Sequence, residues 1–205
     1  MADLIKLYES NIDERKLAQV VYTLKQGGLI IYPTDTVYGL GCDITNKKAL
    51  EKLAQIKGVK LDKAHFSFIC SDLTHLADYV AQLDTSTFKL LKRNLPGPYT
   101  FILPGGRNLP ATFKRKKEVG IRVPAHAIPR ALVTSLGNPI VSTSIKDDDE
   151  ILEYTTDPEL ILEDWKHLVD IVIDGGPGGN VPSTVVDLMQ GEPLLVREGK
   201  GSTLL

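Results

Sequence analysis

The sequence has few features that would set it apart from ordinary globular proteins. It contains 2 cysteines, Cys42 and Cys70, which form no CxxC pair, and we expect both to be buried thiols in a reducing compartment. No apolar run approaches the ~20 residues that cross a bilayer, and the first residues lack the basic start and apolar stretch of a signal peptide. We therefore expect a cytoplasmic protein with no membrane partner.

The chain also lacks a large excess of charge of either sign, and aromatic residues are scarce. The formal net charge is −2 and aromatic residues make up 6% of the chain, which excludes a polycation that coats nucleic acid and disfavours sequence-specific stacking on single-stranded RNA. Charge is concentrated in an acidic run over 147–150 and a basic run over 114–117. Such runs are usually solvated loops, although a basic one can also contact an RNA backbone. The residues predicted for that contact are Lys114, Arg115, Lys116 and Lys117.

The motifs of several common enzyme classes are missing. Gly199 and Lys200 are followed by Gly201, where a phosphate-binding Walker loop needs serine or threonine. A pair of glycines, Gly176 and Gly178, lacks the third glycine of a dinucleotide-binding fingerprint. The 4 histidines form no HExxH motif or Cys/His ligand set, and no GxSxG elbow occurs. We therefore expect no metal site formed by the protein alone.

The pattern of apolar residues predicts a single domain over residues 1–205, because no repeat or linker divides the chain. Asn11 and Glu14 resemble a capping box that starts a helix ending at Gly27. Further helices are predicted over 49–57, 88–94, 128–136 and 160–167. Strands are predicted over 29–32, 66–70, 99–103, 119–123, 139–142, 169–173, 183–188 and 194–197. This mixture, without strict alternation, predicts an α+β (mixed α/β) fold in which helices flank a mixed sheet.

The segment over 32–41, YPTDTVYGLG, carries the most local information. It comes directly after a predicted buried strand, and ligands of open α/β sheets commonly bind where strands end. Thr34 and Thr36 supply hydroxyl groups and Asp35 a carboxylate, which together suit a small polar zwitterion. The alternative is a Pro-Thr-Asp turn that only caps the next segment.

Four further segments occur in order along the chain: NLPGPYT over 94–100, GIRVP over 120–124, PSTVVDL over 182–188 and VREG over 196–199. With the YPTDTVYGLG segment, they resemble the motifs of the YrdC-like family, the threonylcarbamoyl-adenylate synthases. The resemblance covers roughly residues 10–200. It implies an open, twisted mixed sheet that curls around a concave, positively lined cavity, with helices outside.

The resemblance also implies a reaction. Threonine and bicarbonate form N-carboxy-threonine, whose carboxylate attacks the α-phosphate of ATP and releases pyrophosphate. Mg²⁺ accompanies the ATP phosphates, and the product is used to modify an adenosine of certain tRNAs. The expected partners are therefore threonine, bicarbonate and ATP, a tRNA threonylcarbamoyl transferase, and tRNA or double-stranded RNA.

The resemblance assigns site residues at the matching motif positions. Lys57 matches a catalytic, phosphate-facing lysine, and Arg122 matches a contact to threonine and bicarbonate together with Thr34 and Thr36. The positions that match nucleotide contacts are Lys57, Ser142, Ser144, Ser183, Thr184 and Arg197. The plainer alternatives are a lysine bound to helix-end carbonyls, a structural ion pair for each arginine, and hydroxyl groups of turns.

Two departures separate this chain from the full family pattern. Val59 occupies the arginine position of Lys-x-Arg, and Lys146 stands where asparagine belongs after Ser144; both losses resemble the YciO branch. Lys60 or Lys146 is expected to return positive charge to the cavity, as a point charge rather than a planar fork. Three functions remain open: a slow synthase, a nucleotide- or double-stranded-RNA-binding protein without synthase activity, and an enzyme that adenylates or carbamoylates another small amino acid.

Overall fold

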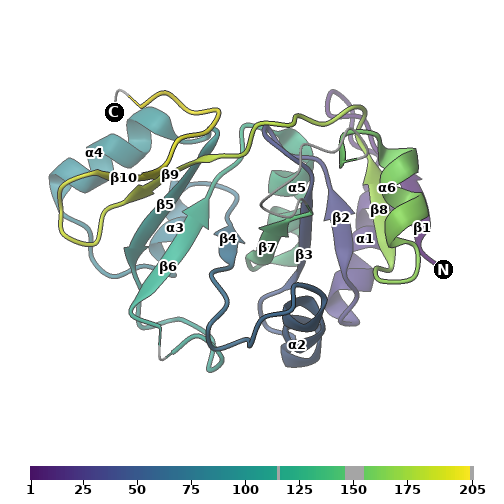
Figure 1. The fold of residues 1–205 in the computed structure, drawn as a ribbon, viewed down its shortest axis with the longest axis horizontal. Coiled ribbons are helices and arrows are strands. Elements are labelled where there is room, and N and C mark those ends of the chain that lie inside the picture. Colours follow the sequence, from purple (N-terminus) through teal and green to yellow (C-terminus); the bar gives the residue numbers. More distant parts are fainter. Residues whose placement is uncertain (115, 146–154, 204–205) are drawn as a thin grey trace.

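A computed structural model describes residues 1–114, 116–145 and 155–203. The described strands form one sheet in the order β1-β8-β2-β3-β7-β4-β6-β5-β9-β10. Some neighbours are parallel, such as β4 and β6, and others are antiparallel, such as β3 and β7. The predicted mixed sheet with flanking helices is therefore confirmed (Figure 1).

The ten strands and six helices of the described residues are short. The strands are β1 (Asp3–Lys6), β2 (Ile30–Tyr32), β3 (Gly39–Asp43), β4 (Ser67–Ile69), β5 (Tyr99–Pro104), β6 (Glu118–Arg122), β7 (Ile140–Ser144), β8 (Ile171–Asp174), β9 (Thr184–Asp187) and β10 (Leu194–Arg197). The helices are α1 (Glu14–Lys25), α2 (Lys47–Ile56), α3 (Leu73–Ala77), α4 (Thr85–Asn94), α5 (Ala127–Leu136) and α6 (Pro158–Trp165).

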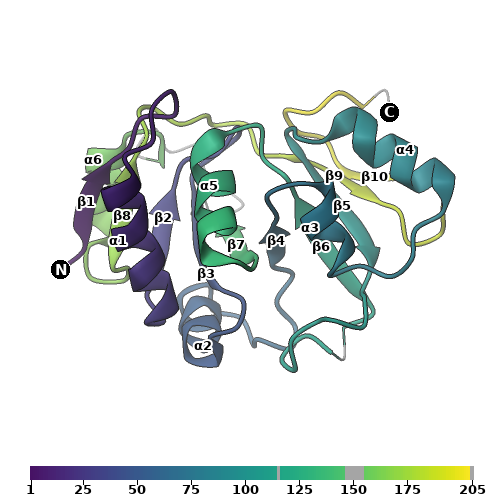
Figure 2. The same ribbon diagram turned by 180° about the vertical axis from the view of Figure 1, so that it is seen from behind.

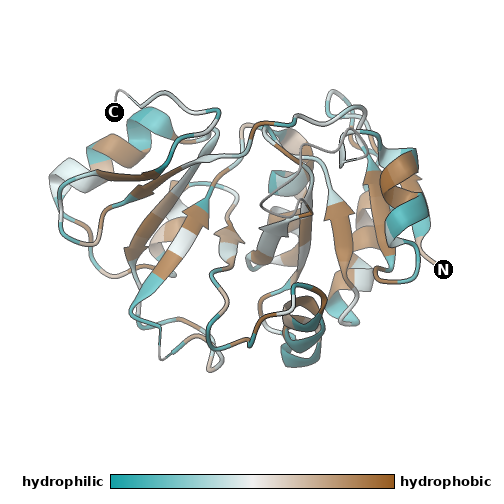
Figure 3. Cartoon of the chain, viewed as in Figure 1, coloured by the Kyte–Doolittle hydropathy of each residue, from teal (hydrophilic) through white to brown (hydrophobic). Residues whose placement is uncertain are grey.

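Helices cover both faces of the part of the sheet around β2 and β8. Alternate residues of β2 point to opposite faces, so Ile30 and Tyr32 pack in one buried cluster and Ile31 packs in another. Figure 2 shows α1 and α5 side by side over one face, and Figure 1 shows α2 and α6 on the other. β2 and β8 are hydrophobic along most of their length (Figure 3). Burial on both faces explains why these strands have continuous apolar sequences.

The first helix begins at a different cap from the one expected. Asp13, not Asn11, is the N-cap of α1, and its carboxylate accepts hydrogen bonds from the backbone N of Arg15 and Lys16 at 2.9 and 3.1 Å. The predicted capping box at Asn11 is therefore wrong by two residues. Aspartate is as good a cap as asparagine, and here it lies directly before the first helical residue.

Three elements were not predicted: β1, β3 and α3. β3 contains Gly39 and Gly41, which weaken a strand signal. Gly41 is nevertheless required there, because an added Cβ would lie 2.8 Å from the carbonyl oxygen of Val141 in β7. The other predicted helices and strands are present, with ends shifted by a few residues.

The two thiols behave as expected. Cys42 and Cys70 are both free and fully buried. In the part of the chain that the structure describes, no helix is long and apolar enough to cross a membrane.

Candidate functional site

A cavity of about 1100 Å³ lies along the strands β7, β4, β6, β5 and β9. Its floor is set by strand register, because Ser67 in β4 lies opposite both Ser142 in β7 and Gly120 in β6. Two hydroxyl groups and a bare glycine therefore lie side by side. The charged lining residues are five lysines or arginines and three carboxylates: Lys63, Lys116, Lys117, Arg122, Arg197, Asp62, Glu118 and Asp187.

Arg122, the last residue of β6, is held firmly at one end of this cavity. Its Nη2 donates to Asp35 Oδ1 at 3.1 Å and to Thr36 Oγ1 at 2.9 Å. Asp35 is itself held, because its Oδ2 accepts from the backbone N of Ala125 at 3.0 Å. Arg122 Nε is buried and has no hydrogen-bond partner among the described residues. The structural ion pair considered for Arg122 is thus present, and it leaves donor capacity for an anion.

Thr34 and Thr36 are buried within the turn that precedes β3. Thr34 Oγ1 accepts from the backbone N of Thr36 at 3.1 Å and donates to the carbonyl oxygen of Val37 at 2.7 Å. Neither threonine lines the cavity, whereas Val37 does. Thr36 reaches the site through its bond to Arg122, so the turn positions the guanidinium group.

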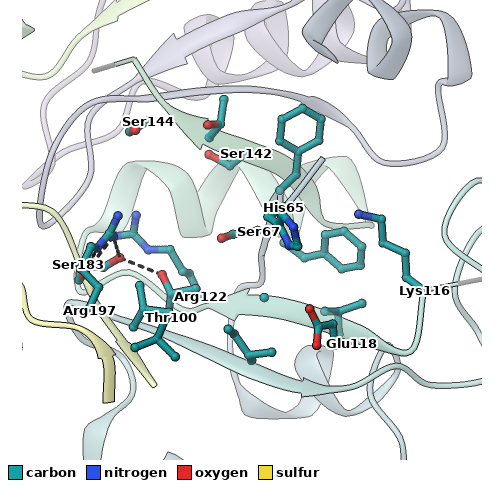
Figure 4. Close-up of a pocket in the computed structure, with 18 of the residues that line it drawn as sticks. His65, Ser67, Thr100, Lys116, Glu118, Arg122, Ser142, Ser144, Ser183 and Arg197 are labelled. Atoms are coloured by element: carbon teal, nitrogen blue, oxygen red, sulfur yellow. Dashed lines mark hydrogen bonds between the residues drawn. The ribbon is translucent and has the colours of Figure 1, made fainter. Parts of the chain in front are cut away.

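A second arginine lies at the same end of the cavity. Arg197 in β10 donates through Nη2 to the carbonyl oxygen of Ser183 at 2.9 Å and to its Oγ at 3.3 Å. Ser183 Oγ also lies 2.8 Å from Thr100 Oγ1, so β5, β9 and β10 are joined there. Figure 4 shows Arg122 and Arg197 reaching toward the Ser183 end of the cavity. Two guanidinium groups at one end of a cavity favour an anionic ligand.

Ser142 contributes a hydroxyl group whose direction is set from behind. The hydroxyl of Tyr32 donates to Ser142 Oγ at 2.5 Å. Complete burial raises the pKa of Tyr32, so it remains a protonated donor. Ser142 can therefore donate its own proton into the cavity, which it lines together with Ser144.

Several predicted residues lie outside the cavity lining. Lys57 is the C-cap of α2, with its backbone N bonded to the Leu53 carbonyl oxygen, and Lys60 is exposed. Thr184 is fully buried and bonds to Gly199 N and to the carbonyl oxygen of Gly201, so it anchors the C-terminal segment. Three predicted features lie outside the described residues: Arg115, Lys146 and the acidic run over 147–150.

The opposite end of the cavity was not predicted as part of the site. Lys116 and Lys117 were expected as RNA contacts on a loop, but they line the cavity together with Lys63 and His65, whereas Lys114 is exposed outside it. Burial lowers the pKa of Lys116, and its Nζ donates to the Ala64 carbonyl oxygen. The only sequence signal for this end was the density of basic residues.

No group of three or more His, Cys, Asp or Glu side chains within residues 1–114, 116–145 and 155–203 could hold a metal ion. A cavity lined by two guanidinium groups, hydroxyl groups and lysines on one mixed sheet suits a small anionic ligand. Residues 22–199 match the Sua5/YciO/YrdC family, whose description is telomere recombination. The chain therefore belongs to this family, which confirms the resemblance seen in the sequence.

Particular relatives refine this placement. YciO of Escherichia coli is 39% identical over 204 residues, which cover 98% of this chain and 97% of YciO. The crystal structure of E. coli YciO matches with a TM-score of 0.91 over 100% of this chain and 98% of that one. A threonylcarbamoyl-AMP synthase of Nitrosococcus oceani is 38% identical over 122 residues, 59% of this chain and 65% of the synthase. P. abyssi Sua5 complexed with L-threonine is 29% identical with a TM-score of 0.84, covering 96% of this chain and 57% of that one.

Proposed function

We propose that this chain is a nucleotidyltransferase that forms threonylcarbamoyl-adenylate from threonine, bicarbonate and ATP, at a slow rate, for delivery to a tRNA threonylcarbamoyl transferase. The observation that supports this most is Arg122, whose guanidinium group is fixed by Asp35 and Thr36 while its Nε has no partner among the described residues. A buried unpaired donor costs ~1–3 kcal/mol, and an anion at this end of the cavity that accepted a hydrogen bond from Nε would remove that cost.

The reaction balances without a covalent protein nucleophile. The threonine amine adds to bicarbonate with loss of water, and the resulting carbamate oxygen attacks the α-phosphorus of ATP. The bond from that phosphorus to the bridging oxygen breaks, and pyrophosphate leaves with the electron pair. Such a transfer depends on positioning and on cationic charge. Mg²⁺ bound to the ATP phosphates would neutralise part of their charge.

The residues of the cavity divide naturally between the two substrates. The preoriented guanidinium of Arg122 suits the threonine carboxylate, which it can bind through Nη1 while Nη2 stays bonded to Asp35 and Thr36. The hydroxyl groups of Ser142 and Ser183 line the same cavity and suit the ribose and phosphate oxygens of the nucleotide. The L-threonine complex of P. abyssi Sua5 supports threonine as the amino acid.

The test is a mass-spectrometric product assay with ATP, Mg²⁺, bicarbonate and threonine, omitting one component at a time. Threonylcarbamoyl-adenylate that requires every component is the expected result. Replacing threonine by other small amino acids in the same assay tests the third function, an enzyme with another acceptor. ATP binding without any product would reject the proposal and leave a binding protein.

A second function is favoured by a specific observation. Lys63, Lys116 and Lys117 line the cavity from one side, and lysine-lined concave surfaces bind RNA backbones. Binding to double-stranded RNA would fall steeply with salt. It would also weaken on charge reversal at the exposed Lys114, which lies outside the cavity lining.

A further inference from the structure

The cavity has two cationic ends that lie far apart. β6 runs along its wall from Glu118 to Arg122, a distance of ~13 Å at ~3.3 Å per residue. Arg122 and Arg197 lie beside Ser183 at one end, whereas Lys116 lies near Glu118 at the other (Figure 4). A ligand with an anionic group at each end would therefore match the cavity.

Strand pairing brings the lysine end together. β4 and β6 are parallel neighbours, with Ser67 opposite Gly120, so the segments that enter these two strands lie at the same edge of the sheet. Lys116 joins the segments, because its Nζ donates to the carbonyl oxygen of Ala64. Their charged or titratable lining residues are Asp62, Lys63, His65, Lys116, Lys117 and Glu118.

The backbone that carries the lysines is well anchored. Phe113 is 1% exposed and packs edge-on against Phe68 in β4, with ring centroids 5.0 Å apart. The backbone N of Lys116 donates to the Phe113 carbonyl oxygen, and the carbonyl oxygen of Lys117 accepts from Gly105 N, both at 2.9 Å. The ammonium groups are thus presented to the cavity from a fixed wall.

The charge at this end is not neutralised within the described part of the protein. Lys63, Lys116 and Lys117 form no ion pair with a described carboxylate, although Asp62 and Glu118 line the same end and moderate its charge. Desolvation lowers the pKa of Lys116, and the attraction of Glu118 and Asp62 offsets that lowering only in part. A bound anion would add to that compensation.

We propose that this end of the cavity is a polyphosphate subsite, in which Lys63, Lys116 and Lys117 bind the β- and γ-phosphates of ATP and then the leaving pyrophosphate. The proposal rests on the proposed function for the identity of the nucleotide. Lysine offers a compact charge with three donors, which suits phosphate oxygens, whereas the guanidinium groups suit the carboxylate at the other end. As the bond to the α-phosphorus breaks, the ammonium groups stabilise the charge that develops on pyrophosphate.

This subsite also accounts for the missing family arginine. Val59, which occupies its position, is 42% exposed, and Lys60 is exposed and does not line the cavity. The phosphate-binding charge is then supplied by the wall that enters β6, rather than by the segment after α2. Of the basic run, Lys116 and Lys117 serve a ligand inside the cavity.

Calorimetric titration of the full chain with inorganic pyrophosphate tests this subsite directly. The double variant Lys116→Ala/Lys117→Ala should bind pyrophosphate at least about tenfold more weakly, and Lys116→Gln should show part of that loss. Lys114→Ala is the matched control, since Lys114 belongs to the same run but is exposed outside the cavity, and it should bind within about twofold of the parent. Glu118→Gln should bind more tightly, because it removes a negative charge from the subsite. Thermal unfolding confirms that each variant is folded.

The other outcomes overturn the subsite. If the parent binds no pyrophosphate, or if only Arg197→Ala abolishes binding, the phosphates are not held at the lysine end. If Lys114→Ala weakens binding as much as the double variant, the lysines form a diffuse surface of the kind that RNA contacts. The product assay on the parent chain decides the proposed function separately. Product formation unaffected by loss of Lys116 and Lys117 would reject only the subsite, whereas lysine-dependent pyrophosphate binding without product would reject only the synthase.

Discussion

Replacing Asp35 by asparagine removes the carboxylate that faces Arg122 without changing its shape. The two side chains are 9% and 11% exposed, and their atoms lie 3.1 Å apart. Removing one partner of a buried ion pair costs ~3–5 kcal/mol, because the other charge is left uncompensated. Asparagine keeps one acceptor oxygen, so we expect a loss near ~3 kcal/mol. For a chain of this size that corresponds to a decrease in Tm of ~6–12 °C.

Thermal unfolding followed by circular dichroism measures this loss. Asp164→Asn is the matched control, since Asp164 is exposed on α6 and the same chemical change there should alter Tm by less than about 2 °C. Arg122→Gln combined with Asp35→Asn completes a double-mutant cycle. The double variant should lose less stability than the two single variants lose together. A Tm for Asp35→Asn within about 2 °C of the parent would refute the view that this pair fixes the guanidinium group.

Three further predictions concern the cavity. The double variant Val59→Arg/Lys146→Asn, which restores the family pattern, should raise kcat for threonylcarbamoyl-adenylate formation by up to about tenfold in the product assay. A folded variant without any gain in kcat would count against the idea that a missing phosphate contact limits the rate. The pKa of Lys116 is lowered by burial, and the unbound folded state therefore releases its proton at a lower pH than an ordinary lysine. Pyrophosphate affinity should accordingly decrease as pH rises through that lowered pKa, and calorimetry on Lys116→Gln should show a flatter pH profile. Gly120→Val places a side chain on the cavity floor, where an added Cβ already lies 3.3 Å from Ser67 Oγ. This variant should reduce kcat/KM by at least about tenfold while the protein stays folded. Unchanged kinetics would mean that the substrates do not span this floor.

Much of the fold can be read from local sequence signals. The strands of the buried sheet are short apolar runs bounded by turn residues, and most were predicted within a few residues. β3 was missed because Gly39 and Gly41, which make close approach to its neighbours possible, are also the residues that usually mark a turn. Asp13 was missed as a helix cap because Asn11 offers the same chemistry two residues earlier.

The candidate site was predictable where a charge interrupts an apolar strand. Arg122 lies among the buried residues of β6, and such a charge needs a carboxylate or an anion; the structure supplies Asp35 and leaves Nε without a partner among the described residues. The direction of the threonine hydroxyl groups was not predictable, because it depends on the closed turn between Thr34 and Val37. The lysine end was not predictable either, because it depends on the pairing of β4 with β6, two strands that lie far apart in the sequence.

That pairing links the fold to the chemistry. In a parallel pair, the segments that enter the two strands lie at one edge of the sheet, and the segments that leave them lie at the other. Lys63 precedes β4 and Lys116 precedes β6, whereas Arg122 ends β6 and meets the turn that holds Asp35. One strand pair therefore produces a cavity with lysines at one end and a fixed guanidinium group at the other. Under the proposed function, Lys116 and Lys117, which enter β6 and line this cavity, would supply phosphate-binding charge without an arginine in the segment after α2.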